Sequence, residues 1–220
     1  MPANFDNLDV DGILSDWVGA LREFAVDALV VLGPDAWNPL QERQVLALYP
    51  PRLLDAAQAL AQSHDFDASW RASDAPMVAW QDISKSATSA TGQWRRKWLA
   101  LGYQSMVRVE FTLPAQRAFE CFMFSARQFH DRNEAAALAW SAMNVWPMLR
   151  RAIAQARSPL SARECECLIL AFEGLTSQQT SERLQCSNRT VIYYLTNAMH
   201  KLGVDSKLAA IQRACWLGVI

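Results

Sequence analysis

Apolar residues in the first 156 positions follow two different periods, which alternate along the chain. A spacing of three and four residues is typical of an amphipathic helix. It occurs in stretches 13–24, 93–101 and 132–156, and a further helix is expected over 53–60, opened by Pro50 and Pro51. Short apolar or alternating runs indicate strands at 28–32, 45–48, 77–80, 105–112 and 117–125.

Two of these predicted helices have a distinct apolar side. In the helix 93–101, Trp94, Trp98 and Leu101 share one face, and the basic triplet 95–97 takes the other. The triplet is interpreted as a solvated face rather than a nucleic-acid patch. In the long helix 132–156, the predicted buried stripe is Ala136, Trp140, Met143, Trp146, Leu149 and Ile153, with a kink expected at Pro147.

The order of elements predicts an α+β N-terminal domain, residues 1–156, in which an antiparallel sheet is flanked by helices. The last two strands are joined by only four residues, 113–116, so they must pair antiparallel. Eight of the nine tryptophans precede Ser158, which gives this domain a large aromatic core. Residues 157–220 are predicted to form a separate, all-α domain.

Capping chemistry marks the helices of this second domain. Ser161 precedes Glu164 by three residues, and Thr176 precedes Gln179 by three, so each pair forms a capping box. Ser187 caps a third helix, which Gly203 ends. A short helix, a tight turn and a longer helix make the helix-turn-helix pattern.

The third helix has a buried side and an outer side. Val191, Leu195, Ala198 and Leu202 recur at helical spacing and are predicted to face the core. An outer row of hydrogen-bonding side chains with one apolar member suits a helix in a DNA major groove. The alternative is a small packing module whose outer side is merely solvated. The residues predicted to face DNA are Asn188, Arg189, Thr190, Ile192, Tyr193, Thr196 and Lys201.

Several short motifs in this domain resemble the LuxR-type DNA-binding domain of quorum-sensing regulators. They are Glu-Gly-Leu-Thr at 173–176, Ser-Asn-Arg-Thr-Val at 187–191, Asn-Ala-Met at 197–199 and Lys-Leu-Gly-Val at 201–204. The resemblance covers about the last sixty residues. It implies a four-helix domain that binds a palindromic promoter site in double-stranded DNA as a homodimer. It also implies a fourth helix over 204–220, with Leu208, Ile211 and Cys215 packed beneath the other three.

The net positive charge of this domain is smaller than expected for a DNA-binding domain. From Ser158 onward there are six basic and five acidic residues, a formal net charge of +1. Gln178 stands where the family commonly has lysine, and Ile192 stands where it has lysine or asparagine. Because phosphate neutralisation supplies much of DNA affinity, we expect modest, salt-sensitive binding. The alternative is an anti-activator that forms a heterodimer with a related regulator and has no useful DNA binding of its own.

The first domain resembles, more distantly, the acyl-homoserine-lactone-binding domain of the same family. The resemblance rests on the order of Tyr49-Pro50, Trp80, Gly102 and Trp146-Pro147. It implies ligand contacts at Tyr49, Leu53, Asp67 and Trp80. Leu53 stands where the family has a tryptophan, and the aspartate matches Asp67 or Asp65 only loosely. Each hydrogen bond lost from a buried head group costs ~1–3 kcal/mol, so a different signal or none is expected.

Composition limits the remaining function classes. The net charge is −1, 51% of residues are hydrophobic, and no apolar run approaches the ~20 residues of a membrane span. The start of the chain has no signal-peptide pattern. Five cysteines without paired spacing indicate reduced thiols and a cytoplasmic protein. The three scattered histidines give no metal-binding spacing, and no nucleophile has a catalytic setting, so neither an enzyme nor a cofactor is expected.

Overall fold

The computed structural model describes residues 9–34, 43–63, 78–84, 92–113 and 117–220. The chain divides into two compact units, an N-terminal unit of residues 1–149 and a C-terminal unit of residues 150–220. Helix α4 (Arg132–Arg157) runs through both units, so the expected domain boundary after residue 156 stays a prediction. In the part of the chain that is described, no helix is long and apolar enough to cross a membrane.

A five-stranded antiparallel sheet forms the centre of the N-terminal unit, as the sequence predicted. Its strands are β1 (Val26–Gly33), β2 (Gln44–Tyr49), β3 (Val78–Asp82), β4 (Ser105–Leu113) and β5 (Arg117–Ser125). They lie in the order β2-β1-β5-β4-β3, and each neighbouring pair is antiparallel. Met77 and the turn residues 114–116 lie outside the described residues.

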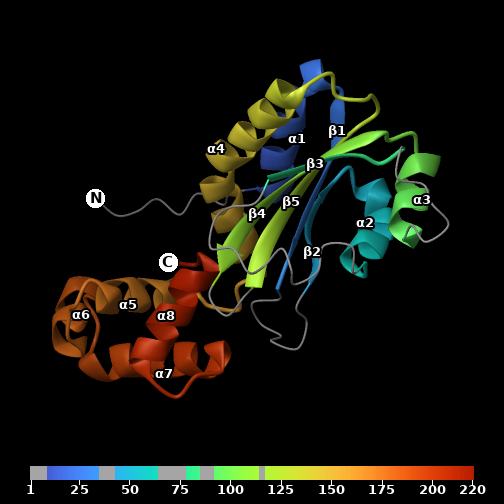
Figure 1. The fold of residues 1–220 in the computed structure, drawn as a ribbon. Coiled ribbons are helices and arrows are strands. Elements are labelled where there is room, and N and C mark those ends of the chain that lie inside the picture. The colour runs from blue at the N-terminus through green and yellow to red at the C-terminus, as the bar shows by residue number, and fades with distance from the viewer. Residues whose placement is uncertain (1–8, 35–42, 64–77, 85–91, 114–116) are drawn as a thin grey trace. The chain divides into compact units, whose positions relative to one another are not determined.

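Helices cover both faces of this sheet (Figure 1). Helices α1 (Val10–Ala20) and α4 lie on one face, and α2 (Leu54–Ala61) and α3 (Gln93–Ala100) lie on the other. On the first face the Trp17 indole Nε1 donates to Ser141 Oγ at 2.7 Å. The ring of Trp146 stacks on Phe111 with 4.3 Å between ring centroids. These contacts hold α1 and α4 against the sheet.

Large aromatic side chains fill the second face. Trp94, Trp98, Phe122 and Phe124 are fully buried there. Trp98 stacks on Phe124 at 3.6 Å between centroids and meets Tyr103 edge-on at 5.1 Å. Because aromatic side chains bury 150–250 Å² each, roughly, this cluster dominates the packing of α2 and α3 on the sheet.

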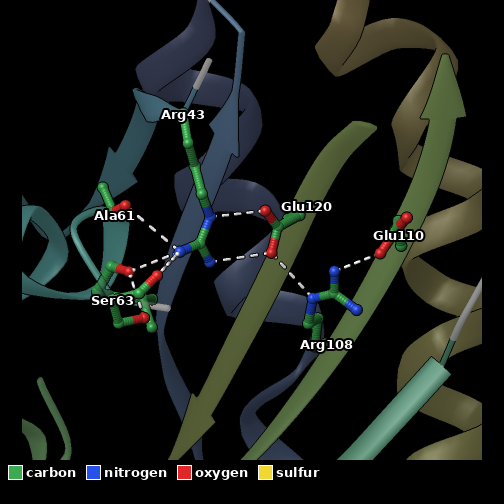
Figure 2. Close-up of polar contacts among 7 residues, drawn as sticks. Arg43, Ala61, Ser63, Arg108, Glu110 and Glu120 are labelled. Atoms are coloured by element: carbon green, nitrogen blue, oxygen red, sulfur yellow. Dashed lines mark hydrogen bonds and ion pairs between the residues drawn. The ribbon is translucent and has the colours of Figure 1, made fainter. Parts of the chain in front are cut away.

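A buried network of four charged side chains crosses the same face of the sheet (Figure 2). Arg43 holds Glu120 with two hydrogen bonds, of 2.7 and 3.0 Å, and Arg108 Nε donates to the same carboxylate at 2.9 Å. Arg108 also donates to Glu110. Glu110 and Glu120 are directly paired across β4 and β5, so the arginine between them offsets a like-charge contact.

Arg43 links this network to the end of helix α2. Its Nη1 donates to the carbonyl oxygens of Leu60, Ala61 and Ser63 at 2.9, 3.3 and 2.9 Å. The last carbonyls of a helix have no partner within the helix, so a buried helix end needs such donors. The network therefore fixes α2 to β5 through one guanidinium group. We call Arg43, Arg108, Glu110 and Glu120 the charge network.

The buried stripe expected on α4 was partly wrong. Trp146 and Leu149 are buried, but Ala136 is exposed and Trp140 is 67% exposed. Instead, Ala135, Leu138, Ala139 and Ala142 are buried. Residues 135–149 carry no charge, so the sequence offers apolar positions all round the helix. Periodicity alone does not decide which side packs.

The basic triplet on α3 is accounted for by contacts within the unit. Lys97 Nζ pairs with Asp55 at 2.5 Å, and Arg95 donates to Gln81 at 3.4 Å and lies over the Trp94 ring. Arg96 is exposed. Arg95 and Lys97 are half-buried, so the expected solvated face is found fully only at Arg96.

Four helices form most of the C-terminal unit, as expected. They are α5 (Ala162–Phe172), α6 (Ser177–Leu184), α7 (Asn188–Leu202) and α8 (Lys207–Leu217). Arg150, from the end of α4, donates to the carbonyl oxygens of Cys215 and Trp216 in the last turn of α8. The expected packing of α8 was wrong at Leu208, which is 75% exposed, and right at Ile211, which is buried. Cys215 is half-buried.

Candidate nucleic-acid interface

The two helices α6 and α7 are joined by a tight turn, and caps define both of them. The Thr176 side chain accepts from the Gln179 backbone N–H, and the Gln179 side chain accepts in return from the Thr176 N–H. Gln185 ends α6 in the left-handed conformation. Ser187 then caps α7 by accepting from the Thr190 N–H at 3.1 Å. Local hydrogen bonds therefore fix where each helix starts and stops.

Helix α7 has the two sides that its sequence predicted. Val191, Leu195, Ala198 and Leu202 are buried against the neighbouring helices. On the other side, Ile192 is 51% exposed and Tyr193 is 61% exposed. A buried row anchors the helix, and large side chains at these exposed positions are available to a partner.

The exposed row contains most of the residues predicted to face DNA. Asn188, Arg189, Ile192, Tyr193 and Thr196 are all exposed on α7. Thr190 is half-buried, and its hydroxyl lies 2.8 Å from the Ser187 hydroxyl at the start of the helix. Lys201 is exposed at the far end of α7 and pairs with Glu164 of α5. We define the exposed row as Asn188, Arg189, Ile192, Tyr193 and Thr196.

Glu164 links helices α5 and α7, a role that the sequence did not indicate. Its carboxylate accepts from the Ser161 N–H at 2.7 Å and from Lys201 Nζ at 2.8 Å, and the residue is 3% exposed. Burial opposes ionisation of this carboxyl, but the bonds from Lys201 and Ser161 outweigh it and lower its pKa. Its capping-box spacing was visible in the sequence, whereas the lysine 37 residues later was not.

This lowered pKa predicts a pH dependence for the C-terminal unit. An ionised Glu164 stabilises the folded state at pH values above about 4.3, the usual value of an unfolded glutamate. The contribution is lost as the pH falls through the lower folded pKa. At pH 7 we expect Glu164→Gln to reduce the free energy of unfolding by about 1.5–3 kcal/mol, the usual worth of a hydrogen bond to a charged group. Denaturant titrations from pH 7 to pH 3 measure this loss.

A matched variant separates this effect from a general loss of charge. Glu166 pairs with Arg163 on the surface of the same helix, with side chains 33% and 56% exposed. Glu166→Gln is therefore expected to change stability by less than about 0.5 kcal/mol. A Glu164→Gln loss that stays constant down to pH 3 would rule out ionisation as its cause.

The residues predicted to contact a ligand in the first domain are not gathered at one place. Tyr49 lies at the end of β2, opposite Leu29 of β1, and Trp80 lies on β3, at the other edge of the sheet. Leu53 packs in the aromatic cluster on the α2 and α3 face. Trp80 is 37% exposed and meets Phe129 edge-on at 6.4 Å. Asp67 and Asp65 lie outside the described residues, and all these assignments stay predictions.

The cysteines behave as packing residues. All five are free, and burial raises the pKa of Cys121 to about 12 and that of Cys165 and Cys167 to about 11. These three thiols are therefore protonated at neutral pH and are poor nucleophiles. Among the described residues, no group of three or more His, Cys, Asp or Glu side chains is placed to hold a metal ion.

Comparison with known proteins identifies the C-terminal helices. Residues 158–214 match the family model described as bacterial regulatory proteins, luxR family. The transcriptional activator protein LuxR of Aliivibrio fischeri is 41% identical over 66 residues, which is 30% of this chain and 26% of that protein. SolR of Ralstonia nicotianae, also a transcriptional activator, is 28% identical over 129 residues, 59% of this chain and 52% of that protein.

A crystal structure of Escherichia coli SdiA aligns with 96% of the chain and 92% of its own length, at 19% identity and a TM-score of 0.49. The matches to LuxR and SolR span about a quarter and about half of those relatives. Both relatives are transcriptional regulators and not enzymes. Residues 158–214, which hold the helix-turn-helix pair α6 and α7, are therefore similar to the luxR family of bacterial regulatory proteins.

Proposed function

We propose that this protein is a transcription regulator that inserts the exposed row of α7 into the major groove of duplex DNA. The observation that carries the proposal is the division of α7 into a buried row and a row with exposed Ile192, Tyr193 and Arg189. Amide, hydroxyl and guanidinium groups bond to base edges and phosphates, and Ile192 suits a thymine methyl group. The luxR-family match over residues 158–214 supports the same function.

Arg189 supplies the positive charge of this row, so its removal is the simplest test. We expect Arg189→Ala to weaken binding to any duplex and to make the slope of log affinity against log salt concentration shallower by about 1. The reason is that one fewer phosphate is neutralised and its counterions are not released. Fluorescence anisotropy of a labelled duplex, titrated between 50 and 200 mM salt, measures both quantities.

Arg163→Ala is the matched control, because it removes the same charge from the exposed start of α5 in the same unit. It is expected to leave the salt slope unchanged within error. Equal slopes for wild type and Arg189→Ala would count against groove insertion by α7.

We infer further that the N-terminal unit folds without a bound signal. This inference is supported by the close packing of Trp94, Trp98, Phe122 and Phe124, whose side chains fill the α2 and α3 face. It is also supported by the wide separation of Tyr49 and Trp80 across the sheet. The competing proposal is a sensor for a non-standard small molecule.

Mass spectrometry of the purified protein decides between these two proposals. We expect no stoichiometric small molecule to co-purify. Candidate signals, among them acyl-homoserine lactones, are expected to leave the melting temperature unchanged, because a ligand bound by the folded state alone must raise it. A co-purifying compound that restores a higher melting temperature would favour the sensor.

The net charge of only +1 from Ser158 onward favours one further function, that of an anti-activator. Such a protein forms a heterodimer with a related regulator and binds DNA poorly. If the protein is an anti-activator, we expect no duplex binding at 50 mM salt. If it is the regulator proposed above, we expect measurable binding at the same salt concentration.

A further inference from the structure

The middle of helix α7 presents hydrocarbon rather than charge to solvent. Ile192 is 51% exposed and Tyr193 is 61% exposed, and the two are adjacent in the exposed row. Residues 190–199 include no charged side chain. The amide and guanidinium groups of the row, on Asn188 and Arg189, lie in the first turn of the helix. We call Ile192 and Tyr193 the apolar pair.

Contacts within the C-terminal unit define the surroundings of the apolar pair. The Tyr193 ring lies 6.0 Å from that of half-buried Tyr194, with the ring planes inclined at 56°. The first lysine or arginine after Arg189 in the sequence is Lys201, and its Nζ donates to the buried carboxylate of Glu164 at 2.8 Å. The middle of α7 therefore offers a base pair apolar surface and hydroxyl groups, whereas residues 190–199 offer no cation.

This chemistry restricts the bases that the middle of the helix can read. In the major groove, guanine is matched by arginine or lysine, adenine by asparagine or glutamine, and cytosine by glutamate or aspartate. None of these six residue types occurs between residues 190 and 196. The base-edge group that an apolar side chain matches is the C5 methyl group of thymine. The apolar pair therefore has the composition expected of a thymine reader.

The two side chains of the pair are close enough to act on one short stretch of bases. A helix rises about 1.5 Å per residue, whereas successive bases of a strand are roughly 3.4 Å apart. Ile192 and Tyr193 therefore reach the same base pair or two neighbouring ones. Burial of both side chains against methyl groups also gains from the hydrophobic effect, which their exposure in the free protein forgoes.

We propose that the exposed row selects its half-site through thymine C5 methyl groups, with Ile192 and Tyr193 as the residues that determine this specificity. The inference rests on the proposed function, because it names the base group that α7 contacts in the groove. It implies that affinity responds to a methyl group even when every charge and every hydrogen-bonding group of the duplex stays the same.

Uracil is thymine without the methyl group, so replacing single thymines with uracil isolates the effect. The probe is a labelled duplex enriched by the full wild-type chain from a random-sequence pool, and fluorescence anisotropy at constant salt measures its affinity. At one or two positions of each half-site, uracil is expected to weaken binding about fourfold, the usual worth of one buried methyl-sized group. Uracil at the remaining thymines is expected to leave the affinity unchanged.

Variants of the apolar pair show whether these two side chains make the contact. Because both are more than half exposed, Ile192→Ala and Tyr193→Ala are expected to fold, and their melting temperatures check this. At each sensitive position, one of the two variants is expected to bind the thymine and uracil duplexes equally. Phe172→Ala is the matched control, because Phe172 is 64% exposed at the end of α5, outside the exposed row. It is expected to keep the wild-type preference.

A cytosine series tests the methyl group in a different base. At a sensitive position the thymine–adenine pair is replaced by cytosine–guanine, with and without a methyl group on cytosine C5. The unmethylated duplex is expected to bind more weakly than the thymine duplex. The 5-methylcytosine duplex is expected to regain at least twofold, because the methyl group is restored although the N4 amino group still replaces the O4 acceptor.

Uracil duplexes that all bind wild type as tightly as the thymine duplex overturn the proposal, as does a cytosine methyl group that brings no gain. A methyl preference that both alanine variants retain overturns the assignment to the apolar pair. A wild type that binds no duplex even at low salt refutes the proposed function, and this inference with it. Duplex binding that has the expected Arg189→Ala salt effect but no methyl dependence refutes this inference alone.

Discussion

Replacing Glu120 with leucine will lower the free energy of unfolding of the N-terminal unit by about 3–5 kcal/mol. Glu120 is 3% exposed and accepts from both Arg43 and Arg108, so its removal takes away the carboxylate that these two guanidinium groups share. Urea unfolding followed by tryptophan fluorescence measures the effect, because eight of the nine tryptophans lie in this unit.

Two further variants show whether unpaired charge is the cause. Arg108→Met/Glu110→Leu removes one charge of each sign and leaves the Arg43–Glu120 pair intact, so it is expected to cost less than Glu120→Leu. Asp55→Asn removes a carboxylate from the exposed pair with Lys97 and is expected to cost less than about 1 kcal/mol. A Glu120→Leu protein as stable as Asp55→Asn would contradict the structural role given to the charge network.

Replacing Trp98 with alanine is the second change with a large expected effect, a loss of about 3–5 kcal/mol from the N-terminal unit. Trp98 is fully buried between Phe124 and Tyr103, so truncation removes its packing and leaves a cavity lined by aromatic rings. Urea unfolding again gives the measurement. Added indole should bind the cavity and restore part of the loss, in proportion to its concentration.

Trp98→Phe is the matched control. The indole N–H of Trp98 is buried and has no hydrogen-bond partner among the described residues, so phenylalanine keeps the stack on Phe124 and removes a donor that forms no bond there. We expect this variant to lose less than half as much stability as Trp98→Ala. Equal losses from the two variants, with no rescue by indole, would show that the aromatic cluster does not hold α2 and α3 to the sheet.

Local features of the sequence predicted most of the fold. Capping pairs such as Ser161 with Glu164, and the apolar row that begins at Val191, depend on neighbours within one or two helical turns. For that reason the starts of α5, α6 and α7 and the buried side of α7 were predicted correctly. The alternation in 105–125 and its short turn likewise led to the β4–β5 pair.

Features that depend on distant partners were not predictable. The charge network joins Arg43 to Glu120, 77 residues away, and needs both the strand order and the register. The edge positions of Tyr49 and Trp80 follow from the order β2-β1-β5-β4-β3, which periodicity does not give. On α4 the uncharged run 135–149 left the packed side undetermined, and Trp140 was assigned to the wrong one.

The exposure of the α7 row could be predicted from helical periodicity. The DNA sequence that the row contacts could not. Tyr193 and Ile192 lie exposed on the helix surface, and neither the burial nor the charges of the unit specify the order of bases in the half-site. The sequence read by the row depends on side-chain contacts that only a bound duplex provides.

Selection of bound duplexes from a random-sequence DNA pool tests the central claim, that α7 reads DNA. We expect the full wild-type chain to enrich an inverted repeat whose half-sites lie about one helical turn apart, roughly 10 base pairs. We also expect Tyr193→Ala or Thr196→Ala to change the base preference at defined positions of the half-site. A pool that stays random with wild-type protein, or a motif that no α7 variant alters, would contradict it.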